Sequence, residues 1–327
     1  MNDYVASVVQ EIEWAKGDGL PTATSVFFGG GTPSRLNAEQ LLQILDAIPR
    51  TDDAEVTVEC NPEDANIERL RAYRAGGVNR MSFGVQSTRP AVLADLGRRH
   101  GTMAHQEVSR AVSEVGFATW NMDLIVGSRA ETLADVAHTL DDLLGLEHPP
   151  PHLSCYVLTP EPGTPLGEDP NRHPDEDASA DAYALVGAVL EVNGYQWEEI
   201  SNWAKAGHEC RHNHVYWDQD DYVGFGSGAH SHRHGRRFWN VRTPDRYIAM
   251  VRSGERPLGG EERLDERTRQ FERDSLALRT SRGVPAEAFA SLDEIAHLVD
   301  VRDGRVTLAT HGRLLANQVI LRLRNVQ

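Results

Sequence analysis

The N-terminal half of the chain alternates between short apolar runs and longer segments in which apolar residues recur at helical spacing. The β-branched and aromatic residues of the short runs predict buried strands at 24–28, 55–59, 80–85, 121–127 and 152–158. The segments between them predict amphipathic helices around 41–45, 70–73, 108–115 and 133–143. This alternation, with a period of roughly 30 residues, is typical of βαβ units. The sequence therefore predicts an α/β fold with a parallel sheet, either doubly wound or curled into a barrel.

The chain opens with an amphipathic helix that no strand precedes. Val5, Val8 and Ile12 recur there at helical spacing, with polar residues between them. Each helix in a βα rhythm follows a strand, so we expect that an N-terminal βα unit has been lost or was never included. Removal of that strand exposes a sheet edge and an apolar flank, and we therefore expect aggregation or a dimer.

The second half of the chain departs from this rhythm. Segment 159–179 is rich in proline, glycine and acidic residues, and a helix around 184–192 and a strand in "YQWEEIS" follow it. We interpret 204–240 as a loop rich in glycine, histidine and aromatic residues. Helical patterns at 243–252 and 265–279 precede a hairpin that turns at Asp303 and Gly304, and a closing helix.

Charge and cysteine content exclude several classes of protein. The 327 residues contain 49 acidic and 33 basic side chains, and the net charge of −16 disfavours nucleic acid as a partner. The three cysteines, Cys60, Cys155 and Cys210, are too far apart for a disulfide framework or a Cys-x-x-Cys metal site. No apolar run is long enough to span a bilayer, and the first residues have neither the basic n-region nor the apolar h-region of a signal peptide. We expect a cytoplasmic protein without stable membrane insertion.

Polar residues and glycines gather where the predicted strands end. "FFGGGTPS" carries three glycines, whereas a tight turn needs only one, so close approach of a ligand to the backbone is the favoured interpretation. Glu59 ends the second strand, Gln86 follows the third, and Asp123 lies within the fourth. The carboxyl ends of parallel strands meet at one edge, where such sheets bind their ligands.

Taken in order, "FFGGGTPS", "VECNPE", "MSFGVQS", "MDLIVG" and "EPGTP" resemble the HemN/HemW family of radical S-adenosylmethionine proteins. The resemblance covers essentially the whole chain. It implies an incomplete parallel (β/α)6-type radical SAM barrel, with five of the six strands present, followed by a smaller C-terminal α+β domain. We divide the chain into a partial barrel (1–170), a barrel-edge and heme-binding segment (171–240) and an accessory domain (241–327).

The resemblance also implies a set of cofactor residues. The glycine strip of the family packs against the methionine end of S-adenosylmethionine. The residues implied for this cofactor are Gly30, Gly31, Thr32, Glu59, Gln86, Arg98, Asp123 and Thr159. The family has a Gly-x-Pro-like turn after its fourth strand, and "GSRAET" replaces it here, which affects the adenine contacts expected around Ser128 and Arg129.

One family motif has no counterpart in the sequence. Family members hold a [4Fe–4S] cluster with Cys-x-x-x-Cys-x-x-Cys on the loop after the first strand, and this chain has no such spacing. We expect that the chain as given does not hold the cluster. Isolated cysteines in or near strands are usually buried apolar side chains, so Cys60, Cys155 and Cys210 are not expected to replace the motif.

The segment "CRHNHVYW" carries the His-Asn-x-x-Tyr-Trp pattern of the heme chaperones within this family. The resemblance implies that His212, Asn213, Tyr216 and Trp217 are associated with heme, with His212 as the axial ligand and His230 as a second candidate. Aromatic faces beside a neutral imidazole suit a flat macrocycle with a central iron. Without the resemblance, a structural loop with hydrogen-bonded histidines is an equally good interpretation.

Three functions follow from the resemblance. The first is a heme chaperone that binds heme and transfers it to hemoprotein acceptors. The second is the radical SAM coproporphyrinogen III dehydrogenase, which decarboxylates propionates and needs the cluster. The third is a cluster-free paralogue, or a protein with a misplaced gene start, whose site only binds S-adenosylmethionine or binds nothing. A DNA-binding winged helix at the C-terminus is disfavoured, because Asp300 and Asp303 interleave with its arginines.

Overall fold

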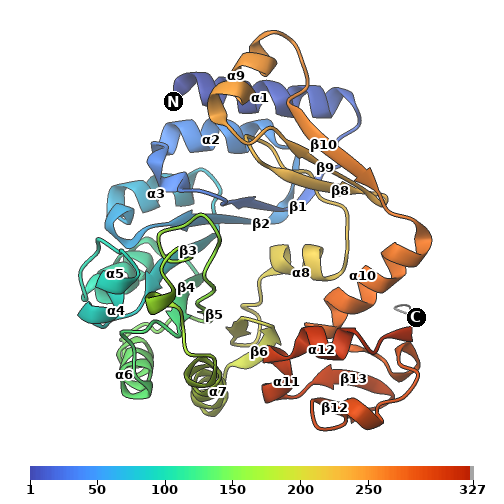
Figure 1. Ribbon diagram of the computed structural model, residues 1–327. Coiled ribbons are helices and arrows are strands. Elements are labelled where there is room, and N and C mark those ends of the chain that lie inside the picture. The colour runs from blue at the N-terminus through green and yellow to red at the C-terminus, as the bar shows by residue number, and fades with distance from the viewer. Residues whose placement is uncertain (325–327) are drawn as a thin grey trace.

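The computed structural model describes residues 1–324 and is built around a curled sheet of seven strands in the order β1-β2-β3-β4-β5-β7-β6 (Figure 1). The strands are β1 (Ala23–Phe28), β2 (Arg50–Cys60), β3 (Arg80–Gln86), β4 (Thr119–Val126), β5 (His152–Val157), β6 (Gln196–Glu199) and β7 (Asn202–Ala204). Strands β1 to β5 are parallel, and β7 and β6 continue the sheet antiparallel. The predicted α/β fold with five parallel strands is confirmed.

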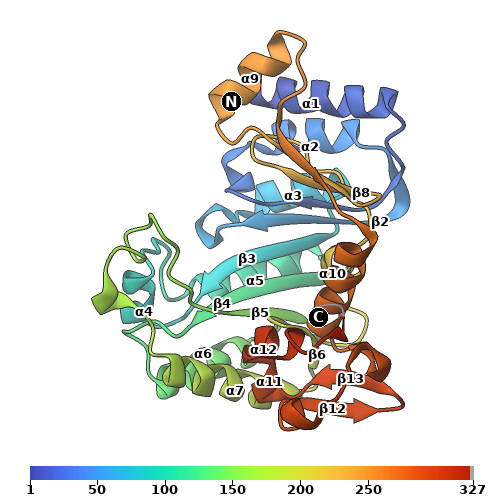
Figure 2. The same cartoon turned by 45° about the vertical axis from the view of Figure 1, so that its right-hand side comes forward.

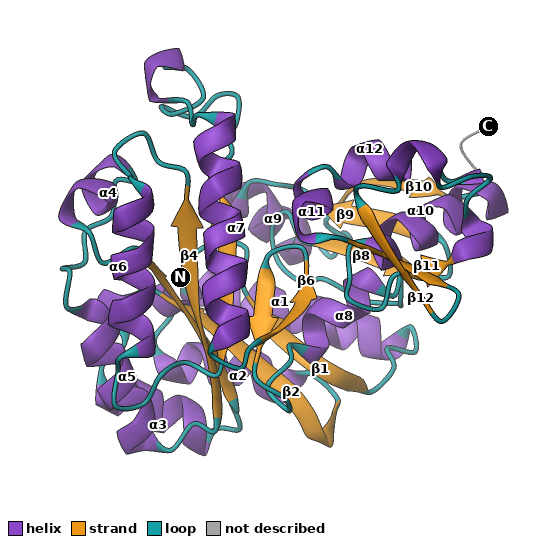
Figure 3. Ribbon diagram, turned by 90° about the horizontal axis from the view of Figure 1, so that it is seen from below, coloured by secondary structure: helices purple, strands orange, loops and turns teal. Residues whose placement is uncertain are grey.

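Helices cover the convex side of this sheet (Figure 3). They are α1 (Asn2–Gly17), α2 (Ala38–Ala47), α3 (Ile67–Ala75), α4 (Pro90–Asp95), α5 (Ala104–Val115), α6 (Leu133–Leu144) and α7 (Glu176–Val192). Short 3-10 helices η1 (Pro33–Arg35), η2 (Pro62–Asp64) and η3 (Pro170–Arg172) lie in the connections. Capping boxes that begin at Asn37 and Thr132 fix the starts of α2 and α6.

Alternation along the strands separates the core from the concave face. Met81, Phe83 and Val85 of β3 belong to the hydrophobic core. Arg80 and Ser82 lie at the intervening positions and therefore face the concave side of the sheet. The core thus fills the space between sheet and helices, and polar side chains remain inside the curl.

The segment predicted as a loop at 204–240 contains regular structure, so that prediction is wrong. It forms α8 (Arg211–Trp217), β8 (His230–Arg233) and β9 (Arg236–Asn240). The hairpin between β8 and β9 turns at His234 and Gly235, which both have positive φ angles of 51° and 76°. His-Gly is not one of the usual dipeptides of such turns, and this is why the pattern was missed. Helix α9 (Pro244–Arg252) and β10 (Leu258–Arg263) follow, and β10 completes a three-stranded sheet.

The C-terminal elements group around the strands β12 and β13 (Figure 2). They have a hydrophobic cluster of their own, which includes Leu278, Val306 and Val319. They are α10 (Glu266–Leu278), β11 (Val284–Pro285), η4 (Ala286–Ala288), η5 (Asp293–Ile295), β12 (Val299–Arg302), β13 (Arg305–Leu308), α11 (Thr310–Leu314) and α12 (Ala316–Ile320). The predicted hairpin turn at Asp303 and Gly304 is confirmed by their φ angles of 50° and 74°. Residues 325–327 of the predicted accessory domain lie outside the described residues.

No helix within residues 1–324 is both long enough and apolar enough to cross a membrane.

Candidate functional site

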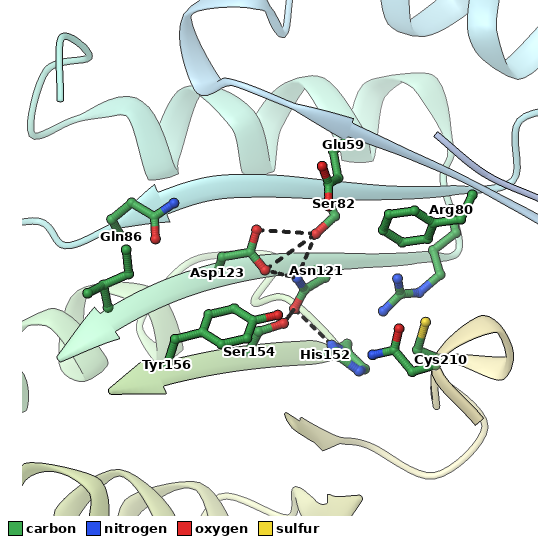
Figure 4. A pocket seen from close by; sticks show the side chains of 13 residues that line it. Glu59, Arg80, Ser82, Gln86, Asn121, Asp123, His152, Ser154, Tyr156 and Cys210 are labelled. Atoms are coloured by element: carbon green, nitrogen blue, oxygen red, sulfur yellow. Dashed lines mark hydrogen bonds between the residues drawn. The ribbon is translucent and has the colours of Figure 1, made fainter. Parts of the chain in front are cut away.

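A cavity of about 290 Å³ lies on the concave face of the main sheet, beside the start of α8 (Figure 4). Its walls come from all five parallel strands and from the segment that enters α8. The lining residues are Phe27, Glu59, Arg80, Ser82, Gln86, Asn121, Asp123, Ile125, His152, Ser154, Tyr156, Cys210 and Asn213. A concave chamber with convergent polar groups is the form that binding sites take.

Strand register brings the polar groups of the cavity into one row. Glu59 of β2 pairs with Ser82 of β3, and Ser82 pairs with Asn121 of β4. Asn121 pairs in turn with His152 of β5. Paired residues of a parallel sheet point to the same face, so these side chains lie side by side inside the curl.

Two carboxyl groups form the acidic part of the cavity. Asp123 accepts a 2.7 Å hydrogen bond from Asn121 Nδ2, and Ser82 Oγ lies 3.4 Å from Asp123 Oδ2. Burial raises the pKa of Asp123, although these hydrogen bonds oppose the shift. Burial and repulsion from Asp123 raise the pKa of Glu59 to about 7, and the backbone N–H of Gly30 opposes that rise. The pair therefore gains stability from a cationic group placed beside it.

The three glycines after β1 play different structural roles. A Cβ on Gly29 would lie 2.5 Å from Phe27 Cε1 and 3.0 Å from the Glu59 carboxyl group. Gly30 has a φ of +75°, which favours glycine. A Cβ on Gly31 would meet nothing within 4 Å. Close contact inside the protein thus explains Gly29, backbone conformation explains Gly30, and neither explains Gly31.

Gln86 lies in the cavity in a conformation that is unusual for its residue type. Its φ is +65°, and its buried Oε1 has no hydrogen-bond partner. Thr32 immediately precedes η1, next to the glycines. Arg98 and Thr159 are exposed and are not among the lining residues. The structure therefore brings Gln86 together with the two carboxyl groups, and it places Arg98 and Thr159 outside this cavity.

Two buried glutamates hold the N-terminus of α8 against the sheet. Glu55 Oε2 accepts from the backbone N–H of Arg211 at 3.1 Å, and Glu55 Oε1 accepts from that of His212 at 3.0 Å. Glu198 Oε1 accepts from the backbone N–H of Cys210 at 2.9 Å. The first N–H groups of a helix lack partners within the helix, so these carboxylates cap α8. Their negative charge is also attracted to the positive N-terminal end of the helix dipole.

His212 occupies the first turn of α8 and contacts β1. Its ring stacks on Phe27, with centroids 4.9 Å apart and an interplanar angle of 17°. Nδ1 lies 3.0 Å from Ser25 Oγ, and Nε2 lies 2.9 Å from the hydroxyl oxygen of Tyr216. Burial and the positive charge of Arg80 lower the pKa of His212 to about 4. The imidazole is therefore neutral at pH 7, which is the form that binds iron.

The neighbours of His212 on α8 point in two directions. Asn213 lines the cavity, and its Nδ2 lies 3.4 Å from Glu199 Oε1. Trp217 also interacts with Glu199 and opposes the rise in the pKa of that carboxyl group. Tyr216 is 40% exposed and meets His212 edge-on, with ring centroids 5.1 Å apart. The predicted heme set therefore presents one face to the cavity and an aromatic face to solvent.

His230 lies apart from this set. It begins β8, is exposed, and stacks on Trp239 with ring centroids 5.8 Å apart. It is not among the lining residues of the cavity.

The sequence interpretation missed Arg80, Asn121 and His152. His152 Nδ1 lies 2.8 Å from Asn121 Oδ1, and His152 Nε2 lies 3.1 Å from Glu198 Oε2. Burial is the largest cause that lowers the pKa of His152 to about 4. The alternation of Arg80, Ser82, Gly84 and Gln86 with apolar residues in "RMSFGVQ" was the pattern that could have revealed this face.

The three cysteines do not fit an iron–sulfur cluster. All are buried and free, and Cys60 and Cys155 belong to the hydrophobic core. Burial raises the pKa of Cys60 and of Cys210 to about 12, and it raises the pKa of Cys155 as well. Metal ligation requires thiolates. Across residues 1–324, no group of three or more His, Cys, Asp or Glu side chains is arranged to hold a metal ion.

Comparison with known proteins places this geometry in context. Residues 2–143 match the model of the radical SAM superfamily. The heme chaperone HemW of Mycobacterium tuberculosis is 38% identical over 95% of this chain and 83% of its own length. HemW of Bacillus subtilis is 33% identical over 98% of this chain and 90% of its own length. The structure of Escherichia coli coproporphyrinogen III oxidase (HemN), a radical SAM enzyme, matches this chain with a TM-score of 0.84 at 23% identity. The match covers 98% of this chain and 82% of the HemN chain, and it shows a shared fold.

Proposed function

This chain belongs to the HemW family, and from that premise we propose that it is a heme chaperone that holds heme at α8 and transfers it to hemoprotein acceptors. One observation carries the proposal. His212 is neutral at pH 7, half-buried and stacked on Phe27, with an exposed Tyr216 ring beside it. A neutral imidazole between aromatic surfaces is suited to bind the iron and to cover the macrocycle.

The hydrogen bonds of His212 prepare it as a ligand. When Nδ1–H donates to Ser25 Oγ, the lone pair of Nε2 is free to accept from the Tyr216 hydroxyl. The exposed Tyr216 side chain would have to move aside for iron to reach Nε2, whereas Ser25 and Phe27 would keep the ring oriented. Asn213 and Trp217 complete the proposed heme set on α8, and His230 stays a second candidate ligand on β8.

We propose that the acidic part of the cavity binds S-adenosylmethionine. The free Oε1 of Gln86 and the open space at Gly30 and Gly31 fit a ligand with an amino-acid end. Glu59 and Asp123 suit its ammonium group or its ribose hydroxyls. Thr32 belongs to the same proposed set, and Arg98 and Thr159 stay predictions from the resemblance. When bound, S-adenosylmethionine supplies a sulfonium centre. The cysteines of this chain do not fit the cluster that would reduce it.

The remaining parts of the proposal concern cellular location and oligomeric state. The free cysteines suit a reducing cytoplasm. Within residues 1–324, strand β1 pairs with β2 alone in the main sheet, and we propose that two copies associate along this edge. Solution scattering tests the dimer, and a monodisperse monomer contradicts it.

Heme transfer tests the proposed function directly. The protein is loaded with hemin, freed of excess hemin on a desalting column, and mixed with an apo-hemoprotein such as apomyoglobin. We expect the Soret band of the acceptor to appear with wild type and with His138→Ala, an exposed histidine on α6. We expect at least tenfold less transfer from His212→Ala. If the wild-type protein retains no hemin after desalting, the proposal is contradicted.

A further inference from the structure

Arg80 is a buried cation without a partner for much of its guanidinium group. The residue is 2% exposed at the start of β3. Its Nε and Nη2 atoms are buried and form no hydrogen bond. Arg80 also lines the cavity, and Figure 4 shows its guanidinium group directed toward Cys210, at the end opposite Gln86. The group is therefore aimed into the space where a ligand would lie.

Burial of a guanidinium group without hydrogen bonds is unfavourable, and other arginines of this chain offset it with an ion pair or an aromatic contact. Arg89 forms an ion pair with Asp142. Arg313 also has buried Nε and Nη1 atoms without hydrogen bonds, but its guanidinium carbon lies 3.9 Å from the ring centroid of Trp197 and it forms a 4.0 Å ion pair with Glu191. Arg80 has no comparable contact among the residues that the structure describes.

Several polar groups that line the cavity with Arg80 are already paired with one another. Asn121 donates to Asp123 and to Ser82 Oγ, and its own oxygen lies 2.8 Å from His152 Nδ1. Glu198 accepts from the other nitrogen of His152. No carboxylate of the cavity forms an ion pair with Arg80 in the part of the chain that the structure describes. The positive charge of Arg80 opposes the rise in the pKa of Asp123, and it lowers the pKa of His152 and of His212.

We propose that Arg80 is the anchor for a carboxylate of the ligand that enters this cavity. A guanidinium group binds a carboxylate through parallel N–H donors, and the free Nε and Nη2 atoms form one such pair. The proposal deepens the function given above, because Asn213 and Phe27, which line the same cavity, join it to α8 and to His212.

Two ligands carry the required group. A heme held by His212 has propionate side chains, and S-adenosylmethionine has an amino-acid carboxylate. Arg80 lies at the end of the cavity opposite Gln86, where the proposed S-adenosylmethionine site holds the amino-acid end, so a propionate is the expected partner and the test separates the two carboxylates by chemistry. Hemin and its dimethyl ester differ at the propionates, which are charged carboxylates in hemin and neutral methyl esters in the other compound, and comparison of their losses between variants tests the contact with Arg80.

The experiment compares wild type with Arg80→Met and Arg80→Lys. Hemin and hemin dimethyl ester are titrated by absorbance at the Soret band, and S-adenosylmethionine is titrated by calorimetry. Arg313→Met is the matched control, because it removes a buried arginine that does not line the cavity. Thermal melting of each apo variant checks its fold. We expect Arg80→Met to melt no lower than wild type, because the substitution removes an unpaired buried charge.

Affinity for one carboxylate ligand is expected to fall roughly 10- to 100-fold in Arg80→Met, with a smaller loss in Arg80→Lys. A loss for hemin but not for its ester assigns the propionate, and a loss for S-adenosylmethionine assigns the amino-acid carboxylate. Unchanged affinity for both ligands, equal losses for hemin and its ester without a loss for S-adenosylmethionine, or no binding of either ligand by wild type overturns the assignment. If wild type binds S-adenosylmethionine but not hemin, the chaperone proposal fails and the Arg80 assignment is decided separately.

Discussion

His212 of α8 stacks on Phe27 of β1, with ring centroids 4.9 Å apart. The adjacent contact between Ser25 and His212 joins residues 187 positions apart in the sequence. Helix α8 is short, and such a helix needs tertiary contacts to persist in water. The proposed heme helix therefore depends on the concave face of the sheet for its position, and the first prediction concerns this dependence.

Glu55→Gln is predicted to loosen α8 without unfolding the protein. The substitution removes a charged acceptor that caps the N–H groups of Arg211 and His212. We expect a loss of about 1–2 kcal/mol in the free energy of unfolding. Chemical denaturation measures this loss, and hydrogen exchange is expected to be faster across 211–217. Glu39→Gln, an exposed change on α2, serves as the control. Unchanged exchange in α8 would argue against the capping role of Glu55.

Tyr216→Phe is predicted to speed heme binding. The Tyr216 hydroxyl lies 2.9 Å from His212 Nε2, so iron must displace it. Removal of the hydroxyl leaves the aromatic face in place and frees the nitrogen. A single hydrogen bond contributes roughly 1 kcal/mol, so we expect hemin association to be about fivefold faster or tighter. Stopped-flow absorbance measures this rate, and slower association than wild type would contradict the geometry.

Glu59→Gln is predicted to change the pH dependence of stability. The pKa of Glu59 is raised from 4.5 to about 7 because of burial and the neighbouring Asp123. Between these values the folded protein binds more protons than the unfolded chain, so wild-type stability falls as pH rises from 4.5 to 7. The variant lacks this loss of at most about 3 kcal/mol. Thermal melts at pH 5 and pH 8 test the prediction, and equal pH slopes would disprove it.

The glycines after β1 allow effects on stability to be separated from effects on ligand binding. Gly29→Ala places a Cβ 2.5 Å from Phe27 Cε1, so we expect it to destabilise the protein by roughly 1–3 kcal/mol. Gly31→Ala meets nothing within 4 Å and is expected to melt like wild type. If Gly31 serves close approach of S-adenosylmethionine, only its affinity should fall, as measured by calorimetry. Full affinity in Gly31→Ala would leave Gly31 without a role in binding.

The fold was predictable because alternation and helical spacing are local. In β3, apolar residues at Met81, Phe83 and Val85 identify both the strand and its core face. The hairpin at His234 and Gly235 was missed because its turn depends on backbone conformations that this dipeptide rarely signals. Segment 204–240 was consequently interpreted as a loop although it contains α8, β8 and β9.

The candidate site was predictable only in part. Glu59, Gln86 and Asp123 were found because each stands at or near the end of a strand, and they share the cavity. Arg80 stands at the start of its strand, and no sequence pattern shows that its guanidinium group is unpaired. Whether the guanidinium group of Arg80 has a partner depends on how Asn121 pairs with side chains of other strands.

A hemin titration is the most direct test of the central claim that His212 binds the heme iron. Wild type, His212→Ala and the control His138→Ala are titrated at pH 7, and the position and amplitude of the Soret band are recorded. We predict a shifted Soret band for wild type and for His138→Ala, and loss of that shift with at least tenfold weaker binding for His212→Ala. An unchanged spectrum and affinity in His212→Ala would contradict the account.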